Sequence, residues 1–282
     1  MTVRPMEGAD VDGVRLVTHA AFAGLEAATG VPEPPAQPPD RARVRIEHPL
    51  ATDPGGCWVA QRKGRVVGAA IAILREGLWG LSLLVVHPAQ QSTGLGRELL
   101  ARAAEYGSGA RGRIILASPD PRALRAYLGL GLELVPAVAA SGVPRGVSAP
   151  AEVRPGGPDD AGLLAEVDQV VRGAAHGADI DRLVEVGHRL LVHPGRGYVT
   201  VGRGGVSLLA ARDEEAAAGL LRAALAGAGD ELIRVEWLSA DQQWAVRECH
   251  RAGLSFHLDW GALLTDGDHG PLRPYLPNGA YL

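Results

Sequence analysis

Cysteine is scarce in this sequence, and its distribution excludes several kinds of site. Only Cys57 and Cys249 occur among 282 residues, far apart in the chain. We therefore expect two buried thiols rather than a disulfide or a cysteine metal site. The nine histidines show no His-x-x-x-His spacing, and no Cys-x-x-Cys pair is present. The sequence thus predicts that no metal is required.

Long hydrophobic runs and concentrated positive charge are also missing. No apolar stretch reaches the roughly 18 residues of a membrane-spanning helix. Arg4, Glu7 and Asp10 stand where a secretion signal would need its apolar segment. The net charge is -4 and the positive residues are not clustered, unlike a nucleic-acid-binding surface. These features predict a cytoplasmic protein that binds neither nucleic acid nor a membrane.

The most informative segment joins an apolar stretch to a helical pattern through a polar turn. Residues 83–86 are apolar, Pro88 follows, and glycines stand at a Gln-x-x-Gly-x-Gly spacing that starts at Gln91. A helical pattern begins at once with Leu95. Glycines let a ligand approach the backbone, and the N–H groups of a helix start favour an anion. The segment predicts a pyrophosphate site, with a tight turn that binds no ligand as the alternative.

The glycine spacing is neither a dinucleotide-binding frame nor a phosphate loop, because no Gly-Lys-Ser/Thr follows. The segment resembles the acetyl-CoA-binding motif of the GNAT acyltransferase superfamily, in which a strand ending V-x-P precedes Q/R-x-x-G-x-G/A and a helix. The matching residues are Val86, Pro88, Gln91, Gly94 and Gly96.

A second motif of the same superfamily follows downstream, where its members read N-x-x-A-x-x-x-Y-x-x-x-G-F. Ala123, Tyr127 and Gly131 match this pattern, while Asp120 replaces the asparagine and Leu132 replaces the phenylalanine. The resemblance implies that Tyr127 protonates the departing thiolate, since a phenol with a reference pKa near 10 stays protonated at neutral pH. A purely structural aromatic on an amphipathic helix is the alternative.

The resemblance also implies a set of residues that hold acetyl-CoA. In the superfamily, the strand before the loop aligns its backbone with the pantetheine arm, and the loop and helix start bind the pyrophosphate. The positions of this chain that correspond are Leu84, Val85, Val86, Gln91, Ser92, Thr93, Gly94, Leu95, Gly96, Arg97 and Asp120.

The opening of the chain recurs in its second half. Residues 3–10 read Val-Arg-Pro-Met-Glu-Gly-Ala-Asp, and residues 153–160 read Val-Arg-Pro-Gly-Gly-Pro-Asp-Asp. Residues 136–158 are rich in Ala, Gly, Pro and Ser, which indicates a linker or an extended crossing segment. We therefore predict an α/β (α+β) protein of two GNAT-like domains, each a mixed, mostly antiparallel sheet flanked by helices. The domains are residues 1–148, the catalytic copy, and 149–282, a degenerate copy with a C-terminal tail.

The second copy is predicted to have lost the cofactor site. Laid over the first copy without gaps, Glu214 falls on Gln91 and Ala217 falls on Gly94. Acidic residues in this place repel a pyrophosphate, and the methyl group of alanine blocks the approach to the backbone. We therefore expect a single cofactor site per chain.

The sequence does not identify a general base. Glu26, Glu47, His48 and Glu76 are candidates on the expected substrate side, and a water chain is the alternative that the superfamily offers. Trp79 is either a wall of the acceptor site or core packing. The proline-rich residues 31–40 are expected to form a stiff connection, and the resemblance implies that this region lines the acceptor cleft.

The chain end is apolar, rich in proline and aromatic at Tyr275 and Tyr281, so it is expected to be bound rather than frayed. By analogy with longer tandem proteins of the enhanced-intracellular-survival type, the carboxylate of Leu282 is a candidate catalytic group that orients or deprotonates the amine. A tail packed as an edge strand or across the domain seam is the alternative.

Together these features predict an N-acetyltransferase that moves an acetyl group from acetyl-CoA to the amine of a small molecule, by direct attack in a ternary complex. A protein lysine or N-terminal acetyltransferase and a non-catalytic acyl-CoA sensor are the alternatives, and a longer acyl chain is not excluded. The sequence leaves open a homodimer.

Overall fold

The computed structural model describes residues 1–29 and 39–282, and side chains outside residues 28–41. The strands form one 13-stranded sheet in the order β1-β2-β3-β4-β5-β12-β6-β11-β10-β9-β8-β7, with β13 paired to β10. The strands are β1 (Thr2–Pro5), β2 (Cys57–Arg62), β3 (Arg65–Arg75), β4 (Leu78–Val86), β5 (Gly112–Ala117), β6 (Glu133–Gly142), β7 (Arg154–Pro155), β8 (Arg189–His193), β9 (Gly197–Gly202), β10 (Gly205–Ala211), β11 (Ile233–Ser239), β12 (Ser255–Gly267) and β13 (Tyr275–Leu276).

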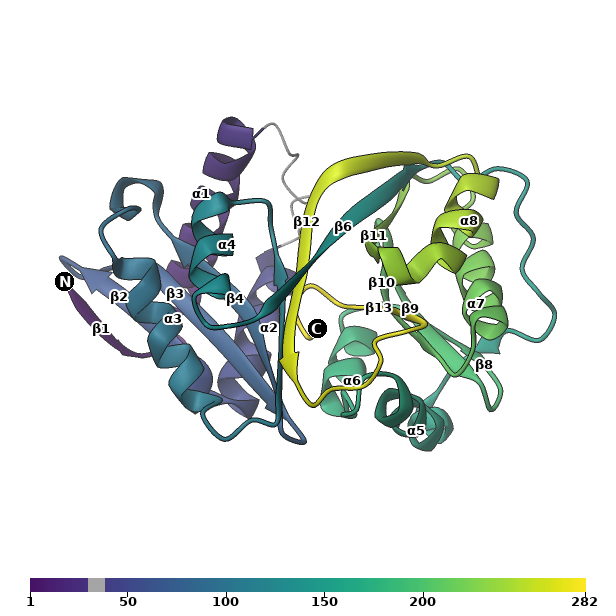
Figure 1. The fold of residues 1–282 in the computed structure, drawn as a ribbon, viewed down its shortest axis with the longest axis horizontal. Helices are drawn as coiled ribbons and strands as arrows, with labels where there is room; N and C mark the ends of the chain where they lie inside the picture. The colour runs from purple at the N-terminus through teal and green to yellow at the C-terminus, as the bar shows by residue number, and fades with distance from the viewer. Residues whose placement is uncertain (30–38) are drawn as a thin grey trace.

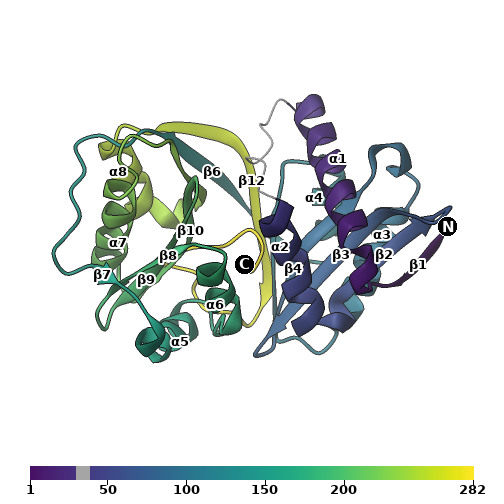
Figure 2. The same ribbon diagram turned by 180° about the vertical axis from the view of Figure 1, so that it is seen from behind.

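Helices cover both faces of this sheet. In the first half, α3 and α4 lie in front of the strands in Figure 1, and α1 and α2 lie on the opposite face, which Figure 2 shows from behind. Only β4–β5 and β10–β11 pair in parallel among the described strands, so the mixed, mostly antiparallel class is confirmed. The helices are α1 (Val11–Thr29), α2 (Pro39–Thr52), α3 (Leu95–Tyr106), α4 (Pro121–Leu128), α5 (Ala161–Val171), α6 (Ala178–Glu185), α7 (Glu214–Ala226) and α8 (Gln243–Arg251).

The repeated sequence at the start of each half folds in the same way. Arg4 donates to both carboxylate oxygens of Asp10 at 2.7 and 2.8 Å, and Asp10 also accepts from the Glu7 amide at 2.9 Å. Arg154 and Asp160 repeat this arrangement at 3.0 and 2.7 Å. The internal duplication is therefore confirmed down to individual hydrogen bonds.

The two halves exchange strands where they meet. β12 follows α8 of the second half, yet it pairs with β5 of the first half; β6 of the first half pairs with β11 of the second. β6 and β12 also pair with each other along their length. Figure 1 shows them as long ribbons that cross the middle of the molecule. Each half therefore needs a strand from the other to complete its sheet.

This exchange affects two predictions, the linker at residues 136–158 and the domain boundary between residues 148 and 149. The expected linker at residues 136–158 begins inside β6, so its first part is a shared strand rather than a linker. The division between residues 148 and 149 falls in the connection from β6 to β7, and it stays a prediction. The proline-rich segment at residues 31–40 lies outside the described residues except at its end, where α2 begins.

Both cysteines are buried, as expected, and burial raises the pKa of each thiol to about 12. No helix in the described ranges is long and apolar enough to cross a membrane.

Candidate active site

The loop after β4 forms the anion-binding turn that the sequence predicts. A short 3-10 turn at Pro88–Gln90 follows the strand, and α3 begins at Leu95. Gly94 precedes the helix with φ of +89°, a conformation that favours glycine, and its missing Cβ leaves open space. The amides of Leu95, Gly96 and Arg97 come before the first intrahelical bond, which Glu98 donates to Gly94. They can therefore bind an anion at the helix start.

Side-chain hydrogen bonds fix the shape of this loop. Gln91 donates from Nε2 to the carbonyl oxygen of Val86 at 3.0 Å and accepts from Arg122 at 2.6 Å. Thr93 donates to the carbonyl oxygen of Gln90 at 2.8 Å, and Ser92 adopts φ of +62°. Gln91 thus ties the loop to the end of β4 and, through Arg122, to the start of α4. The sequence analysis did not single out Arg122, although an exposed arginine beside an anion loop is a signal.

The residue that replaces the family asparagine has a capping role. Asp120 accepts from the Arg122 amide at 2.8 Å at the start of α4, and its other oxygen pairs with the Arg122 guanidinium at 2.8 Å. Burial alone would raise the pKa of Asp120, but these hydrogen bonds outweigh it and lower the pKa. Contact between Asp120 and a cofactor stays a prediction.

Strands β4 and β5 separate toward their C-terminal ends, on the side where the Gly94 loop follows β4. Their parallel pairing runs from Leu78 to Leu81 and ends there, and a bulge at the buried Ser82 breaks the register of β4 with β3. From Leu84 to Val86, the described strands leave the edge of β4 that faces β5 without a partner. A strand edge without a partner offers backbone N–H and C=O groups to an extended ligand. This placement suits the predicted role of Leu84, Val85 and Val86.

Tyr127 lies on α4 in the core beneath this opening. Tyr127 is 5% exposed and packs in the same hydrophobic cluster as Leu81 and Ala117. The pairing of β4 with β5 ends at Leu81, and β5 itself ends at Ala117. Burial and the charge of Asp120 raise the pKa of its phenol, so it is protonated at neutral pH. The general-acid role of Tyr127 stays a prediction.

Most of the residues expected on the acceptor side make structural contacts instead. Trp79 is fully buried and donates to the carbonyl oxygen of Ala103 at 3.0 Å, so it is a core residue and not an acceptor wall. His48 is buried and lies 2.7 Å from the carboxylate of Asp179 in the second half. Glu47 pairs with Arg43 within α2.

Two further candidates have different surroundings. Glu76 accepts from the amide of Ala175 at 2.8 Å at the contact between the halves. Glu26 is exposed on α1. Neither arrangement marks a general base.

The C-terminal tail is bound, as expected, and it contacts both halves. The side chain of Leu282 is fully buried and lies where a Cβ on Gly80 of β4 would stand. Its main-chain oxygen accepts from Tyr275 at 2.7 Å and lies 2.8 Å from Nε2 of the buried His176. Both figures show the C-terminus in the middle of the molecule. This burial favours the packing alternative over a catalytic role for Leu282.

The second half lacks the loop that could bind a cofactor. α7 begins at Glu214, directly after Asp213, which caps it by accepting from Ala216 at 3.0 Å. Ala217 is therefore already inside the helix and buried. β13 also pairs with β10, so the tail lies along the strand that corresponds to the end of β4.

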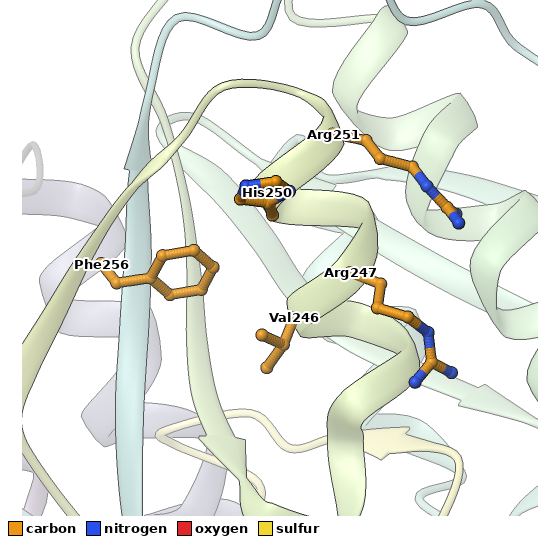
Figure 3. A pocket seen from close by; sticks show the side chains of 5 residues that line it. All are labelled: Val246, Arg247, His250, Arg251 and Phe256. Atoms are coloured by element: carbon orange, nitrogen blue, oxygen red, sulfur yellow. The ribbon is translucent and has the colours of Figure 1, made fainter.

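A hollow on the surface of the second half lies between α8 and β12. Figure 3 shows Phe256 facing Val246 and His250, while Arg247 and Arg251 point away. No acid is present among these lining residues, and we assign no chemistry to this hollow.

Comparisons with known proteins agree with the geometry of the first half. Residues 23–132 match the sequence model of the Acetyltransferase (GNAT) family. Curated proteins give no significant match to the sequence.

Solved structures match over the whole chain. A Pyrococcus horikoshii protein assigned as an acetyltransferase has a TM-score of 0.80 and 18% identity, over 99% of this chain and 94% of that one. A tandem GNAT protein of the clavulanic acid biosynthesis pathway has a TM-score of 0.59 and 20% identity, over 94% and 98%. A GCN5-related N-acetyltransferase from Sphaerobacter thermophilus has a TM-score of 0.58 and 17% identity, over 99% and 98%. Residues 23–132 thus belong to the GNAT acetyltransferase family, whose members generally use acetyl-CoA, and the whole chain has the fold of tandem GNAT proteins.

Proposed function

We propose that the chain is an acetyltransferase that moves an acetyl group from acetyl-CoA to the amine of a small molecule, by direct attack in a ternary complex. The observation that carries this proposal is the opening between β4 and β5, which leads to the Gly94 loop and the start of α3. The loop amides suit a pyrophosphate, and the edge of β4 suits the amide groups of a pantetheine arm.

Acyl transfer needs a neutral amine, a carbonyl held beside it, stabilisation of the oxyanion and an acid for the leaving thiolate. Main-chain groups of β4 after Leu81 would orient the thioester. Tyr127 would donate its phenolic proton to the sulfur. Its raised pKa keeps that proton in place until the thiolate forms.

The covering of the acceptor side supports a small molecule. Arg45 of α2 donates to the carbonyl oxygen of Gly279 at 3.0 Å, and His48 meets Tyr281 edge to face at 5.4 Å. The tail and the second half thus cover the α2 face of the first half, where a peptide substrate would need an open groove. A covered acceptor side leaves less room for a peptide than for a small molecule.

Calorimetric titration with acetyl-CoA, followed by a panel of small amines and peptides with a free-thiol readout, tests the proposal. We expect one binding site per chain and thiol release with a small amine. Two sites would overturn the single-site assignment. Turnover only with peptides would indicate a protein acetyltransferase, and binding without turnover would indicate a sensor.

A further inference from the structure

Two strands at the contact between the halves lose their regular pairing at the same level. The register of β11 against β6 shifts between Val235 and Leu238, so Glu236 and Trp237 lie in a bulge. The register of β12 against β6 shifts between His257 and Gly261, around Trp260. Bulges are common beside active sites, where they redirect side chains. Trp237 also adopts φ of +60°, a strained conformation for a bulky residue that functional sites retain.

These bulges gather a polar and aromatic group, here called the seam cluster, formed by Arg45, Arg234, Glu236, Trp237 and Trp260. The indole rings of Trp237 and Trp260 meet edge to face at 6.4 Å, and the Arg234 guanidinium lies over Trp260 at 4.9 Å. Arg45 comes from α2 of the first half. The seam cluster is thus built from both halves of the chain.

Several donors in the seam cluster have no acceptor in the described part of the protein. Nη1 of Arg234 and the indole Nε1 atoms of Trp237 and Trp260 are buried without a hydrogen-bond partner there. Nη1 of Arg234 is 3.8 Å from Glu236, too far for a hydrogen bond. Buried donors are normally paired, so these are suited to acceptor atoms from outside the chain.

Glu236 is the acid of the seam cluster. Burial raises the pKa of its carboxyl group, against the charges of Arg234 and Arg45, yet a third of its side chain (33%) remains exposed. A carboxylate that is surrounded by protein but still reached by solvent can pair with a cation that enters from outside. The charges of both Arg234 and Arg45 act on this single carboxylate, so the seam cluster also favours a negative group on its ligand.

The seam cluster lies next to the opening between β4 and β5. Ala262 of β12 pairs with Ala117, the last residue of β5. A Cβ on the neighbouring Gly261 would lie 3.3 Å from the Trp237 ring. Trp237 therefore stands beside the end of β5, and Arg45 reaches the cluster from α2, on the face seen in Figure 2.

We propose that the seam cluster binds the acceptor, and that this acceptor is a small amine that also carries a carboxylate, as an amino acid does. Glu236 pairs with the ammonium group as the acceptor binds, and through the exposed part of its side chain the proton passes to solvent before the neutral amine attacks. Arg234 and Arg45 hold the carboxylate. This inference rests on the proposed acetyl transfer for its biological meaning. Its binding test does not depend on turnover.

The test compares free amino acids with their carboxamides and their decarboxylated amines. Calorimetric binding to the full chain with CoA present, and thiol release with acetyl-CoA, are both measured. We expect at least one amino acid to bind, and its matched carboxamide and amine to bind roughly tenfold more weakly. We expect Glu236→Gln to weaken acceptor binding and raise the acceptor KM roughly tenfold or more, with acetyl-CoA affinity unchanged.

Arg234→Met should remove the preference for carboxylated acceptors. Glu231→Gln, an exposed acid just before β11, is the matched control and should change nothing. No binding by any panel amino acid, or unchanged acceptor binding in folded Glu236→Gln, overturns the assignment of the seam cluster. Acetyl-CoA binding without turnover on any amine overturns the proposed function instead, because the amino-acid titration still reports on the seam cluster.

Discussion

The chain carries the same strand–helix unit twice, and the copies differ in how strand leads to helix. After β4, a loop with φ of +89° at Gly94 holds the first amides of α3 open. After β10, Asp213 caps α7 at once, and Arg196 pairs with that aspartate at 3.0 Å. One unit can thus receive an anion, whereas the other satisfies its helix start with its own acid. The same fold can therefore keep or lose a cofactor site through one short turn.

The strand next to each turn shows the same contrast. The end of β4 has no β5 partner beyond Leu81, whereas β10 pairs Leu209 with Leu276 and Ala210 with Tyr275 of the tail. Asn278 adds a hydrogen bond to the carbonyl oxygen of Ser207 at 3.1 Å. The second half thus fills with its own chain the place where the first half is open. This difference is what the following experiments test.

The largest expected effect is the loss of acetyl-CoA binding in Gly94→Glu. The new carboxylate would stand in the anion position, and the residue would be strained at a positive φ. We expect affinity to fall more than about 100-fold by calorimetry, as expected when a like charge replaces an anion site. Gly109→Glu adds the same charge at an exposed glycine with open space and should bind normally. Normal acetyl-CoA binding by folded Gly94→Glu would show that the Gly94 loop is not the cofactor site that distinguishes the first half from the second.

The next effect concerns Tyr127, whose place in the second half is taken by Cys249 when Gly253 is aligned with Gly131. Tyr127→Phe should lower kcat on the order of 100-fold if the phenol is the general acid, with little change in acetyl-CoA affinity. Tyr106→Phe is the control, because the Tyr106 hydroxyl group donates to Asp53 at 3.1 Å in a structural contact. If chemistry limits the rate and kcat is unchanged, Tyr127 is a structural core residue and not the general acid.

Removing Tyr281 and Leu282 tests what the tail contributes. Both residues are buried, at 3% and 0% exposure, and the loss of a large buried side chain costs about 2–5 kcal/mol. We expect a melting temperature lower by many degrees, with the Gly94 loop still able to bind acetyl-CoA in the cold. Loss of turnover with an unchanged melting temperature would instead support a catalytic role for Leu282.

The smallest effect compares the duplicated ion pairs. Hydrogen bonds from Arg4 and Arg154 lower the pKa values of Asp10 and Asp160 below 3.8. Each pair therefore stabilises the fold at neutral pH, and this contribution is lost as the pH falls through the folded-state pKa. Arg4→Ala should lower the melting temperature more than Arg154→Ala, because the Arg4 side chain is 28% exposed and that of Arg154 is 50% exposed. The difference between the two melting-temperature changes should shrink in acid. Equal changes at neutral pH would show that the exposure of the arginine does not determine the strength of the two ion pairs.

Prediction from the sequence succeeded where a feature is local. The turn from Pro88 to Leu95 and the repeat of residues 3–10 at residues 153–160 depend on residues close together in the chain. It left Trp79 open between a wall of the acceptor site and core packing, and the structure shows core packing. The direction in which a strand residue points depends on the bulge at Ser82 and on packing against α3.

The sequence by itself determined the loop that can hold an anion, the duplication and the loss of that loop in the second half, because each rests on residue types at short spacing. Only the tertiary structure decided that β6 and β12 are exchanged and that the tail pairs with β10. It alone brought the charge of Arg45 within reach of Glu236. Those contacts join segments more than 100 residues apart in several cases, such as His48 with Asp179. Such pairings are selected by the combined burial of both halves, which no local pattern encodes.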